Sequence, residues 1–168
     1  KQNIGFDIRG NVKVFDFGLA KSLREDRLNH DDSYNLTANV GSIPYMAPEV
    51  ALGKPYNEKC DLFSFGILLY EIISLKPPFP MAVKQNYTRV VAKRGKRPCI
   101  KNKWPSKTKE IMKSSWMSSP FARASMESIC RMINVDLQEL EAEEQIASRI
   151  ECIANISRHS LSRFCNFD

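Results

Sequence analysis

The chain has 168 residues and a mass of 19.2 kDa, which is the size of a single domain. Hydrophobic residues make up 43% and charged residues 26% of the sequence, so the composition excludes wholesale disorder, collagen-like repeats and low complexity. The formal net charge of +6 permits acidic partners without requiring them. The sequence has no apolar run of the roughly 18 residues that a bilayer demands, so no membrane span is expected.

The start of the sequence and its cysteine content also set expectations. The first residue is Lys1 and the first methionine is Met46, so we expect the chain to be a piece of a longer protein. The cysteines lie too far apart for metal clips or redox motifs; they are Cys60, Cys99, Cys130, Cys152 and Cys165. Reduced thiols are therefore expected, which is typical of a cytoplasmic protein and also of a nuclear one.

Residues 3–15 predict a β-hairpin. Val12, Lys13 and Val14 alternate in the manner of a half-buried strand, and Gly10 with Asn11 tolerates the positive φ of a tight turn. Residues 22–40 are rich in charge, Asn and Ser and have little periodicity. This second stretch predicts a long mobile loop.

The rest of the chain predicts helices. Residues 61–75 are apolar on nearly every face, which is typical of a helix in the middle of a core, with Asp61 placed to cap it and Pro77 to end it. Three later stretches also predict helices, of which the last is amphipathic; they are 106–117, 124–134 and 136–158. We expect a mainly α fold with one short hairpin.

A basic segment, residues 84–113, contains eleven Lys or Arg residues and the single acid Glu110. A solvated helical face explains such a run, and an acidic substrate or partner that docks there is the alternative. Nucleic-acid binding is not predicted, because stacking aromatics are few in this segment, with only Tyr87 and Trp104.

Three short motifs follow one another at characteristic spacing. Asp16-Phe17-Gly18 comes directly after the predicted strand 12–15, and Ala47-Pro48-Glu49 ends thirty-three residues after Asp16. Asn3 lies thirteen residues before Asp16, on the other arm of the hairpin. In this order the chain resembles the eukaryotic protein kinases, in which a catalytic-loop Asn precedes DFG and APE.

Further segments carry the same resemblance. Residues 41–49, GSIPYMAPE, are similar to the family's substrate-binding segment, and residues 116–126 are similar to its W-x-x-x-P-x-x-R-P-[ST]-M pattern, with Ala124 where proline is usual. Residues 56–66 resemble the approach to the family's central helix. The resemblance implies a kinase C-terminal lobe over 1–134, from a parent of α+β class, followed by an amphipathic helix and tail over 135–168.

The resemblance implies a nucleotide site. Asp16 and Asn3 match the family's two Mg²⁺ ligands, and oxygen ligands are what this hard cation prefers. Phe17 is expected to pack inward, and Gly18 to let the backbone turn sharply. The implied cofactors are ATP and Mg²⁺.

Substrate and structural roles are implied in the same way. Gly41, Ser42 and Tyr45 match the segment that seats a protein substrate, and Gly41-Ser42 favours serine and threonine over tyrosine as acceptor. Met46 and the 116–126 pattern indicate the tyrosine-kinase-like branch of the serine/threonine kinases. Glu49 and Arg123 match a buried ion pair of the family.

Two further positions are matched by place alone. Asp61 stands at the family's invariant aspartate before the central helix, where we expect a structural role. The loop 22–40 resembles an activation segment, in which Thr37 and then Ser33 are candidate phosphorylation sites.

No residue of this chain matches the Gly-rich loop, the N-lobe lysine or the His-Arg-Asp motif of the family. The catalytic aspartate is expected upstream of Lys1, and no catalytic residue is assigned here. Two hypotheses follow. The chain is part of a serine/threonine kinase and is inactive by itself, or it is a non-catalytic kinase-like interaction module.

Overall fold

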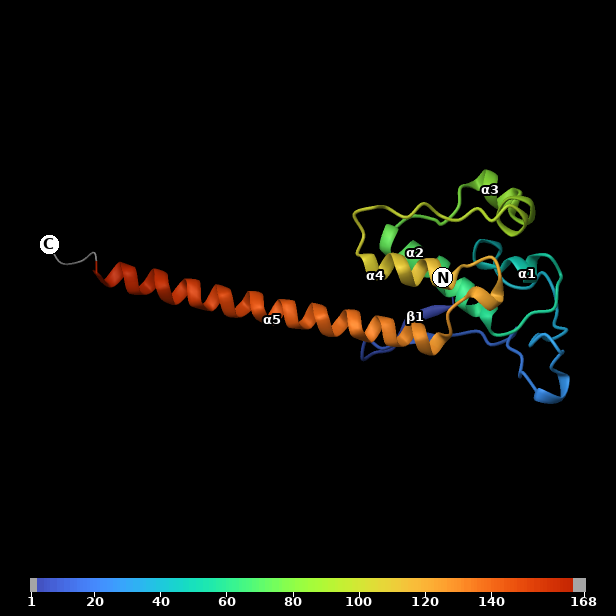
Figure 1. Ribbon diagram of the computed structural model, residues 1–168, viewed down its shortest axis with the longest axis horizontal. Helices are drawn as coiled ribbons and strands as arrows, with labels where there is room; N and C mark the ends of the chain where they lie inside the picture. Colours follow the sequence, from blue (N-terminus) through green and yellow to red (C-terminus); the bar gives the residue numbers. More distant parts are fainter. Residues whose placement is uncertain (1–2, 165–168) are drawn as a thin grey trace. The chain divides into compact units, whose positions relative to one another are not determined.

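The computed structural model describes residues 3–164, with the backbone alone for residues 82 and 148–164 (Figure 1). Its contacts divide the chain into two units, Lys1–Met126 and Glu127–Asp168. The described part is mainly helical with one two-stranded sheet, as expected. The domain boundary placed between residues 134 and 135 stays a prediction.

The hairpin forms where the sequence predicts it. Strands β1 (Ile4–Phe6) and β2 (Val12–Val14) pair antiparallel, with Ile4 opposite Val14 and Phe6 opposite Val12. The turn is stabilised by Asp7, whose carboxylate accepts hydrogen bonds from the backbone N–H groups of Arg9 and Asn11. The apolar side chains of both strands are exposed; Phe6 is 73% exposed and Val12 is 62% exposed.

Helix α2 (Lys59–Ser74) is the centre of the first unit. Phe63 and Ile67 on this helix are fully buried, and Met112 and Trp116 from α4 (Ser106–Ser115) and its C-cap join the same core. The two helices approach closely at Gly66, where an added Cβ would lie 2.8 Å from the Cβ of Ser115. Glycine at this position therefore sets the distance between α2 and α4.

Short helical segments surround α2. Helix α1 (Pro48–Ala51) packs on η3 (Thr88–Lys93), a π-helical turn, while η2 (Ile43–Tyr45) and η4 (Pro120–Ala122) contact α2 itself. Proline stands at the first or second position of α1, η2 and η4, where its missing N–H costs no hydrogen bond. The remaining segments are η1 (Glu25–Arg27) and α3 (Met81–Gln85).

The ends of α2 differ from the expectation. The helix begins at Lys59, so Asp61 lies within its first turn and the prediction that Asp61 is the N-cap is wrong. Its carboxylate still faces the positive end of the helix dipole. At the other end, Leu75 adopts a left-handed conformation, with φ of 53°, and is 88% exposed. The helix thus ends before Pro77, by a cap that usually requires glycine.

Helix α5 (Met126–Phe164) is continuous over 39 residues. The prediction of separate helices at 124–134 and 136–158 is wrong, because no proline or glycine interrupts this stretch. Its described apolar side chains between 135 and 146 are exposed. None of the helices in the described part of the chain has the length and apolar character that a bilayer crossing requires.

Candidate functional site

Asn3 and Asp16 meet across the hairpin. The Asn3 Nδ2 group donates to Asp16 Oδ2 at 3.4 Å, and the backbone N–H of Phe15 donates to the carbonyl of Asn3 at 2.8 Å. The pairing of β1 with β2 therefore fixes the separation of the two side chains. Both side chains are exposed, and each carries an oxygen atom that could bind a metal.

The backbone at Asp16 is in a conformation that few non-glycine residues adopt, with φ of 59°. Its Oδ1 atom accepts a hydrogen bond from the backbone N–H of Gly18 at 3.2 Å, which holds the turn. Strained backbone of this kind costs about 1–3 kcal/mol and concentrates at functional sites. Among the described residues no cluster of three or more His, Cys, Asp or Glu side chains could hold a metal by itself. One carboxylate and one amide fit a Mg²⁺ ion whose other ligands are phosphate oxygens and water.

Phe17 differs from the expectation. Its side chain is 71% exposed, and Leu19 beside it is 61% exposed, so the prediction that Phe17 packs inward is wrong. The physical reason is local: no described element covers the segment that follows Asp16. Phe17 and Gly18 thus lie beside the Asn3–Asp16 pair without enclosing it.

The segment 41–49 runs along the outside of α2. Gly41 has φ of 95° and is exposed together with Ser42, while Tyr45 is half-buried. The Tyr45 hydroxyl donates a hydrogen bond to the Glu71 carboxylate near the end of α2. Burial together with that carboxylate raises the pKa of Tyr45 to about 12, so the hydroxyl stays protonated and keeps donating. This bond anchors the segment on the helix.

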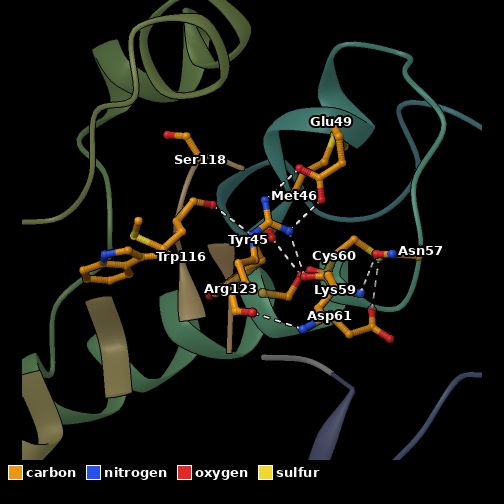
Figure 2. Close-up of polar contacts among 12 residues, drawn as sticks. Tyr45, Met46, Glu49, Asn57, Lys59, Cys60, Asp61, Trp116, Ser118 and Arg123 are labelled. Carbon is orange, nitrogen blue, oxygen red and sulfur yellow. Dashed lines mark hydrogen bonds and ion pairs between the residues drawn. The ribbon is translucent and has the colours of Figure 1, made fainter. Parts of the chain in front are cut away.

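The ion pair expected between Glu49 and Arg123 is present and buried (Figure 2). Arg123 Nη1 lies 2.6 Å from Glu49 Oε1, and Nη2 lies 2.8 Å from Oε2, so the contact is bidentate. The arginine side chain has 0% exposure and the glutamate side chain 6%. The pair joins the end of the 41–49 segment to the loop before α5.

The same arginine binds two other parts of the unit. Arg123 donates to the carbonyls of Met117 and Lys59, and Lys59 Nζ donates in return to the carbonyls of Arg123 and Ala124 at 3.0 Å each (Figure 2). Each nitrogen of this reciprocal clamp therefore has at least one partner. No buried side-chain N or O atom lacks a hydrogen-bond partner in the described chain.

A second arginine supports the same core. Arg97 lies 4.8 Å from the ring centre of Phe63, and Arg123 lies 5.2 Å from the same centre. Arg97 Nε donates to the Trp116 carbonyl at 2.8 Å. Burial lowers the pKa of Arg97 from its ordinary value, and the nearby Arg123 charge lowers it further.

The candidate phosphorylation sites differ in access. Thr37 is exposed, and its carbonyl accepts a hydrogen bond from the Tyr56 hydroxyl at 2.8 Å. Ser33 is buried, with 6% exposure; its hydroxyl donates to Asp31 and accepts from Asn29. Only Thr37 offers a free hydroxyl in this conformation.

Comparison with known proteins agrees with this geometry. The family described as protein tyrosine and serine/threonine kinase matches residues 1–133. The chain belongs to the protein kinase family.

Individual relatives support the same assignment. A probable LIM domain-containing serine/threonine-protein kinase of Dictyostelium discoideum is 37% identical over 119 residues, which is 71% of this chain and 17% of that protein. Mitogen-activated protein kinase kinase kinase 7 of Drosophila melanogaster is 37% identical over 120 residues, 71% of this chain and 16% of that protein. Serine/threonine-protein kinase STY17 of Arabidopsis thaliana is 30% identical over 143 residues, which is 85% of this chain and 24% of that protein. The chain spans less than a quarter of each of these relatives.

Two cavities in the described part of this kinase chain border the loop 22–40. One, of about 290 Å³, is lined by Cys60, Asp61 and Lys21 among others. Burial raises the pKa of the Cys60 thiol to about 12, and the carboxylates of Asp61 and Glu49 act in the same direction, so this thiol is neutral. The other cavity, of about 380 Å³, has Lys21, Arg24 and Arg27 in its wall.

Sequence reasoning missed several residues of this kinase lobe. Lys59 and Glu71 lie on α2, where the apolar pattern of the helix gave no sign that either side chain had a specific partner. Arg97 stands inside the basic segment 84–113, and its sequence neighbours are exposed cations such as Lys96 and Lys101.

Proposed function

We propose that the protein containing this chain is a serine/threonine kinase that uses ATP and Mg²⁺ to phosphorylate protein substrates. The observation that carries the proposal is the Asn3–Asp16 pair. Two oxygen-bearing side chains are held together across a hairpin, and one of them sits on strained backbone. The order of Asn3 and the Asp16-Phe17-Gly18 motif, which the chain shares with the family's pattern, supports a role of this pair as metal ligands.

In this proposal Asp16 and Asn3 bind the metal through a carboxylate and an amide oxygen. Mg-ATP, when bound, supplies the phosphoryl group and neutralises charge on it. The chain's own contribution is position: the β1–β2 pairing and the Gly18–Asp16 hydrogen bond hold the ligands in place before the metal arrives. Catalysis by positioning is the main requirement of phosphoryl transfer.

The segment 41–49 seats the protein substrate in this proposal. It is supported by its two anchors, the Tyr45–Glu71 hydrogen bond and the Glu49–Arg123 ion pair. Gly41 and Ser42, which precede both anchors, are exposed, so an extended peptide can approach them. The cavity walled by Lys21, Arg24 and Arg27 also has Leu36 in its lining, so these cations are available to a phosphate on the adjacent, exposed Thr37.

The alternative is an interaction module that keeps the fold without catalysis. Its supporting observation is the basic segment 84–113, where Lys93, Arg94, Lys96, Lys101 and Lys103 are exposed. An acidic protein partner fits such a surface. The retained Asn3–Asp16 pair favours the kinase.

Binding of Mg-ATP by the full-length protein separates the two functions. The melting temperature is measured with and without saturating Mg-ATP, together with phosphate transfer to a mixed serine and threonine peptide substrate. We expect a rise in melting temperature that is lost in Asp16→Ala and reduced in Asn3→Ala. The control variant Asp26→Asn changes an exposed carboxylate outside the Asn3–Asp16 pair and should keep the rise in melting temperature.

Absence of any nucleotide-dependent shift in the unmodified protein would exclude the kinase proposal and favour the interaction module. A shift that survives in Asp16→Ala, with unchanged phosphate transfer, would show that Mg-ATP binds elsewhere.

A further inference from the structure

Arg97 is a half-buried cation whose hydrogen-bond acceptors are all neutral. Its guanidinium donates to the carbonyls of Trp116, Val91 and Lys96, and Nη2 donates to the Ser118 hydroxyl at 3.1 Å. A charged donor forms its strongest hydrogen bonds with a charged acceptor. None of the partners of Arg97 among the described residues supplies that charge.

The surrounding cluster has a surplus of one positive charge. The guanidinium groups of Arg97 and Arg123 both lie over the Phe63 ring. The carboxylate beside them, Glu49, is engaged by Arg123 through both of its oxygens. The partners of Arg97 are therefore backbone carbonyls, the Phe63 ring and the Ser118 hydroxyl.

That hydroxyl stands where an added group has room. Ser118 is exposed, and it lies on the wall of a cavity of about 430 Å³ together with Lys54 and Ser119. Two carboxylates line the same cavity: the charge of Glu49 is paired with Arg123, and Asp31 accepts a hydrogen bond from the Ser33 hydroxyl. A group attached to Ser118 Oγ thus lies next to Arg97 Nη2, and Lys54 is a second cation among the residues that line the cavity.

We propose that Ser118 is a phosphorylation site whose phosphate is received by Arg97. The donor is a nucleoside triphosphate used by a protein kinase that acts on this chain. The Ser118 hydroxyl oxygen forms a bond to the γ-phosphorus, the bond from that phosphorus to the β–γ bridging oxygen breaks, and the hydroxyl proton passes to a carboxylate base of the acting enzyme. The products are phosphoserine and the nucleoside diphosphate.

The modification replaces a neutral hydrogen bond by a charge-assisted one. The phosphate brings about −1.5 to −2 charges and three acceptor oxygens to a cation that has no anion. Arg97 also donates to the carbonyls of Val91 in η3 and of Trp116 after α4. A phosphate at Ser118 therefore fastens the 116–120 loop to η3.

Titration of the phosphate itself is the test. The 168-residue chain is made with phosphoserine encoded at position 118, and the second ionisation of the phosphate is followed by ³¹P NMR at low ionic strength. An isolated phosphoserine ionises near pH 6. We expect the phosphate at 118 to ionise at least about half a pH unit lower, because Arg97 favours the dianion.

Ser119 is the matched control, since it is the next residue, is exposed and donates or accepts no hydrogen bond with Arg97. Phosphoserine at 119 should titrate near the isolated value. Equal titration of the two phosphates would overturn the proposal. In the Arg97→Lys background the value at 118 should move back toward that at 119; if this variant fails to fold, the comparison of 118 with 119 still decides.

Two further arms separate attached phosphate from free phosphate and establish use of the site. Inorganic phosphate added to the unmodified chain should leave its melting temperature where equal ionic strength of chloride leaves it; a specific rise would identify a free-anion site and overturn the modification. Mass spectrometry of the protein from its own cells should find phosphate on Ser118. Recovery of that peptide only unmodified, beside other phosphorylated peptides of the protein, would also overturn it.

Discussion

Two arginine–carboxylate pairs in this chain share their chemistry and differ in their surroundings. Arg123 and Glu49 are buried, bidentate and joined to several backbone carbonyls. Arg24 and Asp26 also form two hydrogen bonds, but their side chains are 62% and 61% exposed. Water screens the second pair and competes for its hydrogen bonds, so equal geometry does not mean equal stabilisation.

Glu49→Gln tests this difference. The substitution leaves the buried Arg123 without a counter-charge, and we expect the free energy of unfolding to fall by about 3–5 kcal/mol. Urea denaturation measures it. Asp26→Asn is the matched control and should cost less than about 1 kcal/mol. Similar losses in both variants would contradict the structural role given to the Glu49–Arg123 pair.

Ser33 and Thr37 lie in one loop, and loss of the hydroxyl should cost more stability at Ser33 than at Thr37. Ser33→Ala removes a buried group that links Asn29 to Asp31, and we expect a loss of about 1 kcal/mol in unfolding free energy. Thr37→Ala removes an exposed side chain and should change stability by less than about 0.5 kcal/mol. Denaturation of the two variants side by side checks this, and a larger loss at Thr37 would be the contrary result.

At the scale of elements, the hairpin and α2 represent opposite extremes of burial. The β1–β2 ladder is short and its side chains are exposed, whereas α2 is surrounded by the core. Local opening requires little loss of apolar contact in the first case and much in the second.

Hydrogen exchange should show this contrast. Amides in the β1–β2 ladder are expected to exchange with far lower protection than amides in the middle of α2, near Phe63 and Ile67. Exchange followed by mass spectrometry or NMR on the 168-residue chain gives both values in one experiment. Equal protection of the two elements would show that the hairpin is held by contacts beyond its own ladder.

The closeness of α2 to α4 depends on Gly66. In Gly66→Ala the new Cβ meets the Ser115 Cβ, and overpacking costs about 1–3 kcal/mol, partly offset by about 1 kcal/mol of helix propensity. We expect a net loss of unfolding free energy in thermal or urea denaturation. The double variant Gly66→Ala with Ser115→Gly removes the clash and should lose less than the sum of the two single changes. Additive losses would show that the contact does not limit the packing.

At the scale of the whole molecule, burial of the Cys60 thiol and the Tyr45 hydroxyl makes the stability of the chain depend on pH in the alkaline range. The pKa of Cys60 rises from an ordinary 9.0 to about 12, chiefly through burial, and that of Tyr45 rises from 10.0 to about 12 for the same reason. Between the unfolded and folded values the folded chain holds more protons than the unfolded chain. The contribution of these two groups to stability is therefore complete below pH 9 and is lost as pH rises from 9 toward 12.

Cys60→Ser isolates one of these groups because serine does not ionise in this range. The unmodified chain should lose stability between pH 9 and 10 more steeply than Cys60→Ser, with a difference of at most about 1.4 kcal/mol per pH unit, the slope of one proton. Urea denaturation at several pH values measures both slopes. Parallel slopes would mean that Cys60 ionises in the folded chain as readily as in the unfolded one.

Local patterns in the sequence were sufficient to predict the hairpin, the buried helix and the Glu49–Arg123 pair, because each has a short-range signal or a family motif. Features that depend on three-dimensional surroundings were missed. Phe17 is exposed because nothing described covers it, and α5 runs on through residue 135 because polar residues alone do not end a helix. In the sequence Arg97 is indistinguishable from its exposed neighbours, because its contact with the Phe63 ring exists only in the folded chain.

The left-handed leucine that ends α2 bears on how this chain could have evolved. Leu75 is nearly fully exposed, so its side chain contributes little packing, while its positive φ is a conformation that glycine adopts without strain. Yet no single nucleotide change converts a leucine codon into a glycine codon. The routes pass through valine, whose branched Cβ tolerates this φ still less, or through arginine, tryptophan or a stop codon. The stabler terminus is thus separated from the present one by the genetic code rather than by the fold.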